Sequence, residues 1–370
     1  YFTYFTGDEE YKNNTYNNTL EFYNIFRDTP TEIHSKSQRK LSSKFTINRE
    51  LIKYFTRINY KSEIYNQFFS VEDKKINEVS TSHSYFRSFP IFGVDFEIPF
   101  KLSNNYNHFV YTPKLSIRLS PGISNTNKIS NEDSSVNSFS IDNADNLNRY
   151  TGSDKMDNSK RINLGFNINN ENISGSLFQT YEFTNNSNFH YSQGNEKKLS
   201  DLLGNLNFKK NVLSTSYNFR YDNYDKFIKK QNLELNYENK FGYYNFNYLD
   251  QKSKTDEIIV SDKETLNYKY DTKKFYKYSK ISYFGLYDLK NEINTESGIR
   301  YSYFDECFGV NLDFKRNSYT EGELKPQDIL TIMFSFKNIG SYKSTNLAVS
   351  ETDKQEIEWE NLKINNELFK

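Results

Sequence analysis

The feature that most constrains this chain is a period of two in its apolar residues, repeated along most of its length. In the stretch NLELNYENK, Leu233, Leu235 and Tyr237 alternate with Glu234 and Asn236. Successive side chains of a β-strand point to opposite faces, so this alternation predicts strands with one apolar and one polar face. Helical periodicity is nearly absent before residue 340. We therefore predict an all-β fold.

About sixteen runs of this kind can be counted, each long enough to form a strand. Transmembrane β-strands need about 9–11 tilted residues to cross a bilayer, and runs of this length meet that requirement. The runs lie at 16–26, 37–47, 52–69, 84–101, 106–118, 160–169, 173–184, 199–208, 212–222, 227–239, 243–250, 263–271, 275–287, 291–303, 307–316 and 328–339.

The connections between the runs alternate in length. In an up-and-down sheet successive turns lie at opposite ends, so all the longer loops gather at one end. This asymmetry is typical of transmembrane β-barrels, and it predicts an antiparallel up-and-down barrel that closes on itself in the membrane. Short connections at 223–226 and 288–290 are exceptions. Tight turns are expected at 48–50, 103–105, 170–172, 209–211, 239–242, 272–274 and 304–306, and longer loops at 70–83, 119–159, 185–198, 251–262 and 317–327.

Composition narrows the possible functions. Only 35% of the residues are hydrophobic, which by itself would suggest disorder. The chain also has 31 Tyr and 32 Phe, however, and a disordered chain would not contain so many aromatic residues. Lys+Arg and Asp+Glu both number 48, so no net charge attracts nucleic acid, and we expect no nucleic-acid partner. No window approaches the roughly 18 apolar residues of a transmembrane helix.

No set of residues with the spacing of a catalytic or metal site is apparent. The four histidines, His34, His83, His108 and His190, are scattered, and neither a nucleophile elbow nor a zinc-protease motif is present. We predict that the chain is not an enzyme and holds no cofactor. A Ser-His-Asp arrangement stays open, because such triads are assembled in space rather than in sequence.

Other architectures share the alternation. A soluble β-sandwich would bury the apolar stripes between two layers and turn the polar faces outward. A passive porin or a TonB-type receptor barrel would have the same kind of wall, but a porin would conduct ions and a receptor would carry an N-terminal plug domain. Alternation alone does not say which face is outward, so these alternatives remain open at this point.

Residues 84–166 carry motifs that resemble a known family. The stretches are SYFRSFPIFGVDFEIPF, HFVYTPKLSIRLSPG, NEDS and NLNRYTGSDKMDNSKRINLGF. They resemble the barrel domain of the outer-membrane LPS-assembly family LptD, in its alphaproteobacterial form. The closing stretch DILTIMFSFKNIGSYKS, residues 328–344, resembles that family's last strand. The matching positions are Arg87, Pro90, Asp95, Pro113, Asn131, Glu132, Asp133, Ser134, Leu147, Asn148, Arg149, Gly152 and Asp154.

The match to the family pattern has departures. The loop lacks the Phe and the spacer expected between Leu147 and Asn148, and Tyr150 and Lys155 stand where the family has Phe and Arg. Contacts that family members make through these positions are therefore not expected to be the same in this chain.

The resemblance implies a barrel of roughly 26 strands, of which this chain would supply the C-terminal part. Residues 1–340 would be barrel and residues 341–370 a polar tail, with a short helix around 353–363. The protein would lie in the outer membrane of a Gram-negative bacterium and insert lipopolysaccharide (LPS) into the outer leaflet. Implied partners are an LptE-like lipoprotein plug, a periplasmic LPS-transport bridge, LPS itself and outer-membrane lipids. The end with tight turns would face the periplasm.

The resemblance also assigns residues to three features. The loop motif would fold the long loop over the lumen, with Arg149 and Asp154 in charge-assisted bonds and Gly152 at a positive φ; a solvated surface loop is the alternative. Cys307 would lie at the periplasmic end of the penultimate strand, either disulfide-bonded to a cysteine outside these residues or as an inert thiol. The loop motif comprises Asn131, Glu132, Asp133, Asn148, Arg149, Gly152 and Asp154, and one wall of a lateral gate would comprise Leu330, Ile332, Phe334 and Phe336 toward lipid with Thr331, Met333, Ser335 and Lys337 toward the lumen.

Overall fold

The computed structural model describes most of the chain, and almost all of the regular structure in it is β. Within the described residues the chain forms 22 strands and one four-residue helix, α1 (Ile141–Ala144). None of the described helical residues forms a helix long and apolar enough to span a membrane. The described ranges are 3–11, 14–31, 33–77, 79–104, 107–123, 125–136, 139–184, 197–255, 258–273, 276, 278–318, 326–337, 340–343 and 347–349.

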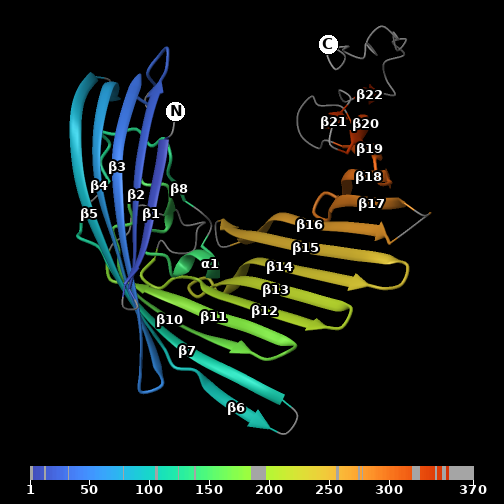
Figure 1. The fold of residues 1–370 in the computed structure, drawn as a ribbon, viewed down its shortest axis with the longest axis horizontal. Coiled ribbons are helices and arrows are strands. Elements are labelled where there is room, and N and C mark those ends of the chain that lie inside the picture. The colour runs from blue at the N-terminus through green and yellow to red at the C-terminus, as the bar shows by residue number, and fades with distance from the viewer. Residues whose placement is uncertain are drawn as a thin grey trace. The chain divides into compact units, whose positions relative to one another are not determined.

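Strand bounds follow the order of the chain (Figure 1). They are β1 (Thr3–Tyr11), β2 (Asn14–Phe26), β3 (Ser37–Lys53), β4 (Thr56–Ile76), β5 (Val79–Glu97), β6 (Phe100–Asn104), β7 (Asn107–Leu119), β8 (Ser135–Val136), β9 (Tyr150–Thr151), β10 (Lys160–Asn169), β11 (Ile173–Glu182), β12 (Leu202–Lys210), β13 (Leu213–Asp222), β14 (Phe227–Glu238), β15 (Gly242–Thr255), β16 (Ile258–Thr272), β17 (Ser279–Asp288), β18 (Ile293–Phe304), β19 (Phe308–Asn317), β20 (Gln327–Phe336), β21 (Gly340–Lys343) and β22 (Leu347–Val349).

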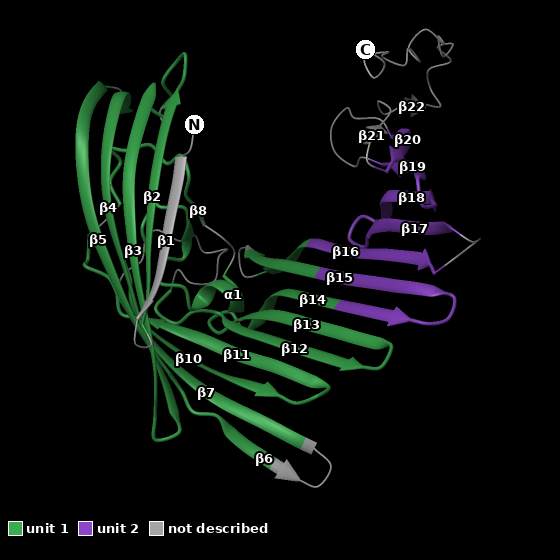
Figure 2. Cartoon of the chain, viewed as in Figure 1, with its two compact units in different colours: residues 1–233, 250–262 green, residues 234–249, 263–370 purple. Residues whose placement is uncertain are grey.

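The chain divides into two compact units (Figure 2). Unit 1 comprises residues 1–233 and 250–262, and unit 2 comprises residues 234–249 and 263–370. In unit 1, antiparallel pairs run in the order β1–β2–β3–β4–β5–β7–β10–β11–β12–β13, and β6 pairs with β7. In unit 2, antiparallel pairs run in the order β16–β17–β18–β19–β20. The predicted all-β, antiparallel up-and-down sheet is thereby confirmed.

The exposed face of unit 1 carries an apolar row beside polar positions such as Asn66 and Ser88. Register places Phe22 opposite Leu41, Leu41 opposite Phe68, and Phe68 opposite Phe86, in one row across four strands. These four side chains are 41%, 47%, 48% and 65% exposed. The alternate positions on the same strands, including the polar side chains of Lys40 and Gln67, are buried.

Unit 2 shows the same alternation. Tyr283, Ile299, Phe314 and Leu330 lie opposite one another in an apolar row across β17 to β20. One residue along each strand, a polar row runs through Ser282, Arg300, Asp313 and Thr331. The period of two in the sequence therefore becomes two chemically distinct faces in each unit.

Two of the predictions of longer loops are wrong, because the strands extend into both segments. At 70–83, β4 continues to Ile76 and β5 starts at Val79, with a register shift between Val71 and Lys74. At 251–262, β15 continues to Thr255 and β16 starts at Ile258. Both segments lack a regular alternation of apolar and polar residues, so the strand pattern does not extend through them in the sequence.

Three further boundaries differ from the sequence prediction. The turn expected at 48–50 lies instead at Tyr54 and Phe55, whose φ angles of 48° and 65° suit a two-residue type I′ turn. The run at 84–101 is broken before Phe100, because Pro99 lacks the N–H that a strand ladder needs. Strand β1 was not predicted at all.

Candidate functional site

The candidate site is the long segment 120–159, which packs against the polar face of unit 1. It carries α1 and the small β8–β9 sheet, which pairs separately from the main strands. Apolar contacts fasten it in three places, and each contact joins the segment to strands far away in sequence. The clusters are Leu147 and Met156 with Tyr65, Phe89 and Ile91; Phe139 and Ala144 with Phe178 and Leu203; and Ile129 with Phe69 and Val71.

Lys40 of β3 is the centre of the first polar cluster. Its Nζ lies 2.6 Å from Asp133 Oδ2 and 2.9 Å from Asp154 Oδ1, and it donates a 2.7 Å hydrogen bond to Ser153 Oγ. The Lys40 side chain is 0% exposed. The hydroxyl of Tyr23 donates to Asp154 at 3.1 Å. Two loop carboxylates therefore share one buried ammonium.

These contacts act on the two loop carboxyls in opposite directions. For Asp133, burial raises the pKa, but Lys40 and hydrogen-bond donors outweigh burial, so the pKa is below its ordinary value. For Asp154, burial and the neighbouring Asp133 outweigh Lys40, so the pKa is above its ordinary value. This pair is the electrostatically constrained part of the loop.

The same carboxylates brace the two halves of the loop motif. Asp133 Oδ1 accepts hydrogen bonds from the backbone N–H groups of Asp154 at 2.8 Å and Ser153 at 3.1 Å. Asp154 Oδ2 accepts reciprocally from the N–H of Glu132 at 2.8 Å and of Asp133 at 3.2 Å. The two halves meet closely at Gly152, whose φ is +81° and where an added Cβ would lie 2.3 Å from the Asp133 carbonyl oxygen. Only glycine satisfies both conditions without strain.

The remaining residues of the motif, Asn131, Asn148 and Glu132, make local hydrogen bonds in the loop or an ion pair with a residue outside it. Asn131 closes a turn through bonds with the backbone of Ser134 at 3.0 and 2.6 Å. Asn148 Oδ1 accepts from the N–H of Asp157 at 3.0 Å. Glu132 forms an ion pair with Arg27.

Arg149 forms a second buried cluster. Its Nε lies 2.6 Å from Asp157 Oδ2, and its Nη2 lies 3.2 Å from Glu182 Oε2 at the end of β11. Arg161 of β10 reaches the same Asp157 oxygen at 2.9 Å. Burial lowers the pKa of Arg149, but the two acids outweigh burial and leave the pKa above its ordinary value.

Sequence reasoning missed a third cluster, around Arg118 of β7. Arg118 Nη2 lies 2.6 Å from Asp95 Oδ1 and 2.7 Å from Asp145 Oδ1, and Lys114 Nζ lies 2.5 Å from Asp145 Oδ2. Burial raises the pKa of Asp145, but Arg118 and Lys114 outweigh burial and lower the pKa to about 2. Lys40, Arg118 and Arg161 all occupy polar-face strand positions next to the loop. That placement was the available signal.

The residues expected to form a gate lie in unit 2, on β20. Phe334 and Phe336 are exposed, whereas Leu330, Thr331, Ile332, Met333 and Ser335 are half-buried. Besides β19, β20 pairs with β21 and β22, two short strands in the region expected to be tail. The helix expected around 353–363 lies outside the described residues. Cys307 is exposed and unpaired in this part of the chain, in the turn between β18 and β19.

The site is built for mutual neutralisation. Among the residues that the structure describes, no group of three or more His, Cys, Asp or Glu side chains could hold a metal ion. Asp133, Asp145, Asp154 and Asp157 of the loop have cationic partners from the strands. The arrangement can hold the loop against the sheet.

Antiparallel strands with an exposed apolar row and a buried polar row under a long loop are features that outer-membrane β-proteins share. The sequence matches the family LptD, LPS transport system D, over residues 2–283, more than half of the chain. The chain belongs to this family, as its motifs predicted, and is an outer-membrane protein. No curated protein matches the sequence.

Solved structures of outer-membrane receptors and a porin align with the chain at low sequence identity. The siderophore receptor PirA from Acinetobacter baumannii has a TM-score of 0.47 at 9% identity, covering 89% of this chain and 63% of that one. The ferric enterobactin receptor PfeA has the same score and identity, with 89% and 61% covered. A mutant porin from Rh. blastica has a TM-score of 0.32 at 8% identity, with 92% and 100% covered. The chain thus spans less than two thirds of both receptors.

Proposed function

We propose that this chain is part of the wall of a closed outer-membrane barrel of roughly 26 strands that moves LPS to the outer leaflet. Residues 1–340 would be barrel and residues 341–370 a tail. The family match supports the transport role. An LptE-like lipoprotein plug and a periplasmic LPS-transport bridge are the proposed protein partners, and LPS and outer-membrane lipids are the proposed lipid partners.

The observation that carries this proposal is the inversion of the two faces. The apolar row from Phe22 to Phe86 is exposed, whereas Lys40, on the opposite face of the sheet, is wholly buried. In water, apolar exposure costs about 25 cal/mol per Å². Against hydrocarbon the same exposure is favourable, and a polar interior suits the sugars of LPS.

Transport of an amphiphile also needs a sideways exit for acyl chains. We propose β20 as one wall of that exit, with Leu330, Ile332, Phe334 and Phe336 toward lipid and Thr331, Met333, Ser335 and Lys337 toward the lumen. Because β21 and β22 pair with β20, opening would require these short strands to leave its edge. The strand on the other side of the gate would come from outside this chain.

Segment 120–159 then acts as a fixed cover rather than as a moving part. Four of its carboxylates, those of Asp133, Asp145, Asp154 and Asp157, pair with Lys40, Arg118 or Arg161, each from a different strand of unit 1. Releasing the segment would separate these cations from those carboxylates, although Arg118 would keep Asp95. The proposed substrate path therefore follows polar strand positions that the segment does not cover.

Site-specific photocrosslinking in cells tests this function. A photoreactive phenylalanine analogue at Ser335 is expected to crosslink LPS on the lumen side, and the same analogue at Phe314, on the apolar row, is the matched control for bulk-lipid contact. No LPS adduct at Ser335, together with steady ion conductance of the purified protein in planar bilayers, would instead identify a passive pore.

A further inference from the structure

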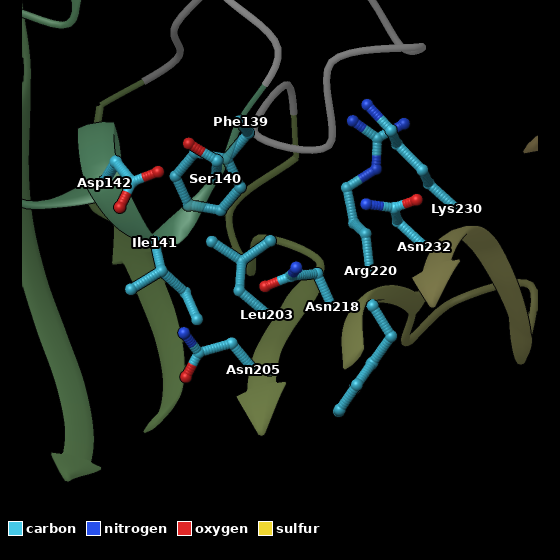
Figure 3. A pocket seen from close by; sticks show the side chains of 12 residues that line it. Phe139, Ser140, Ile141, Asp142, Leu203, Asn205, Asn218, Arg220, Lys230 and Asn232 are labelled. Carbon is cyan, nitrogen blue, oxygen red and sulfur yellow. The ribbon is translucent and has the colours of Figure 1, made fainter. Parts of the chain in front are cut away.

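A second feature of unit 1 has no part in the loop bracing described above. A pocket of about 280 Å³ lies where α1 meets β12, β13 and β14 (Figure 3). Its volume is at the lower end of the range of about 300–1,000 Å³ typical of ligand sites, so it suits one small ring rather than a chain of them. Side chains of Phe139, Ile141, Leu203, Asn218, Arg220 and Lys230 are among those that line it.

One side of the pocket is apolar and rigid. Phe139 and Leu203 belong to a buried cluster, and Ile141 packs against that cluster. The C–H face of a sugar ring is flat and apolar, so a wall of this kind offers it contact without competing polar groups.

Amide side chains form the middle of the pocket. Asn205 and Asn218 are opposite each other in the β12–β13 register, and Asn232 of β14 also lines the space. Each amide offers both donors and an acceptor, which is what neighbouring ring hydroxyls require. Three such groups around so small a volume favour a polyhydroxylated ligand over a purely apolar one.

The opposite side carries two cationic side chains, Arg220 and Lys230. Arg220 and the neighbouring Lys229 share Asp201 at 3.5 and 3.3 Å, and Lys229 lies 2.8 Å from Asp222. Lys230 forms no ion pair with any described residue and adds a further charge beside Arg220 in Figure 3, where Asp142 lies on the other side of the pocket.

We propose that this pocket binds a single sugar ring that carries an anionic substituent, a phosphate or a carboxylate. The ring lies against Phe139 and Leu203, its hydroxyls bond the asparagines, and its anionic group pairs with Arg220 and Lys230. The inference rests on the proposed function only for the source of the sugar, which would be the saccharide part of LPS. A free sugar phosphate offers the same chemistry.

Binding of glucose 6-phosphate to the full chain in detergent micelles tests the pocket, with saturation-transfer NMR as the readout. Lys230→Gln is expected to weaken this binding about tenfold, equal to about 1.4 kcal/mol, and to leave binding of methyl glucoside unchanged. Asn218→Trp fills the pocket and should abolish binding of both. Lys209→Gln alters an exposed lysine of β12 outside the pocket and should change neither.

Two results would overturn the pocket. One is retention of glucose 6-phosphate binding in Asn218→Trp, and the other is equal weakening by Lys209→Gln and Lys230→Gln, which would indicate general attraction of anions. Competition by purified LPS supports a lipid-borne sugar; binding of glucose 6-phosphate without such competition overturns that source alone. Absence of the LPS crosslink at Ser335 together with intact sugar binding would contradict the proposed transport function but not the proposed sugar site.

Discussion

The polar faces of the two units differ in what covers them. In unit 1, Lys40 is 0% exposed and pairs with Asp133 and Asp154 from segment 120–159. In unit 2, Arg300 pairs with the cross-strand Asp313, but the two side chains are 45% and 24% exposed. Both pairs arise from polar residues that alternate with apolar ones along a strand.

This difference shows that the alternation determines which face a residue occupies, but not how much the residue contributes to the free energy of unfolding. Arg300 is exposed to water beside its partner, so its ion pair adds little. Lys40 has no access to water, so removing its partners or replacing it leaves charge buried. Position relative to segment 120–159 decides between the two cases.

The largest effect is expected for Lys40→Met. The change leaves Asp133 and Asp154 without their shared cation and should lower the free energy of unfolding by about 3–5 kcal/mol. Urea unfolding in detergent micelles measures the loss, and limited proteolysis should show new cleavage within 120–159. Wild-type resistance in the variant would mean that apolar contacts alone hold the segment.

Gly152→Ala should cost somewhat less, about 2–3 kcal/mol, because it combines a left-handed backbone with a close contact. The matched control is Gly122→Ala. Gly122 also has a positive φ, +86°, but an added Cβ there meets nothing within 4 Å. The difference between the two variants in urea unfolding isolates the contact with Asp133; equal losses would show that backbone strain is the whole effect.

Asp145 gives a pH dependence of about 2 kcal/mol, from a shift between an ordinary pKa of 3.8 and about 2 in the folded protein. Because the folded pKa is the lower one, this stabilisation is complete above about pH 4 to 5 and is lost as the pH falls toward 2. Protection of the backbone amides of residues 141–149 against hydrogen exchange, relative to their intrinsic rates at each pH, should fall over that window. Asp145→Asn should remove this pH dependence of the protection; an unchanged profile would assign it to another group.

The smallest effect is expected for Arg300→Met, which tests the exposed half of the comparison. An exposed pair contributes roughly 0–1 kcal/mol and is screened by salt. Urea unfolding at low and high ionic strength should show a difference from wild type only at low salt. A loss as large as that of Lys40→Met would erase the distinction between covered and uncovered faces.

The sequence predicted the strands of this fold well where one face is apolar. The row from Phe22 to Phe86 follows from alternation within each strand. Prediction failed where the alternation is irregular, as in the end of β4, where the register shifts between Val71 and Lys74. The break between β5 and β6 follows from residue type, because Pro99 lacks the N–H that a strand ladder needs.

For the site, the sequence identified one side of the ion pairs of Lys40 and of Arg149, and neither side of the ion pairs of Asp145. Asp133, Arg149 and Asp154 were marked by the family motif. Lys40, which is 93 residues from Asp133, was not marked, because only the register of β3 brings the two together. A partner at such a distance cannot be deduced from one sequence, although polar-face lysines and arginines form a short set of candidates.

The bracing of segment 120–159 also sets an order for assembly. Asp154 needs Tyr23 and Lys40, which are made before the segment, whereas Asp157 and Arg149 need Arg161 and Glu182, which are made after it. The segment can therefore dock only once β2, β3, β10 and β11 already stand in their places. Complete docking of the segment therefore requires correct placement of the strands on both sides, because its contacts join residues of such long sequence separation.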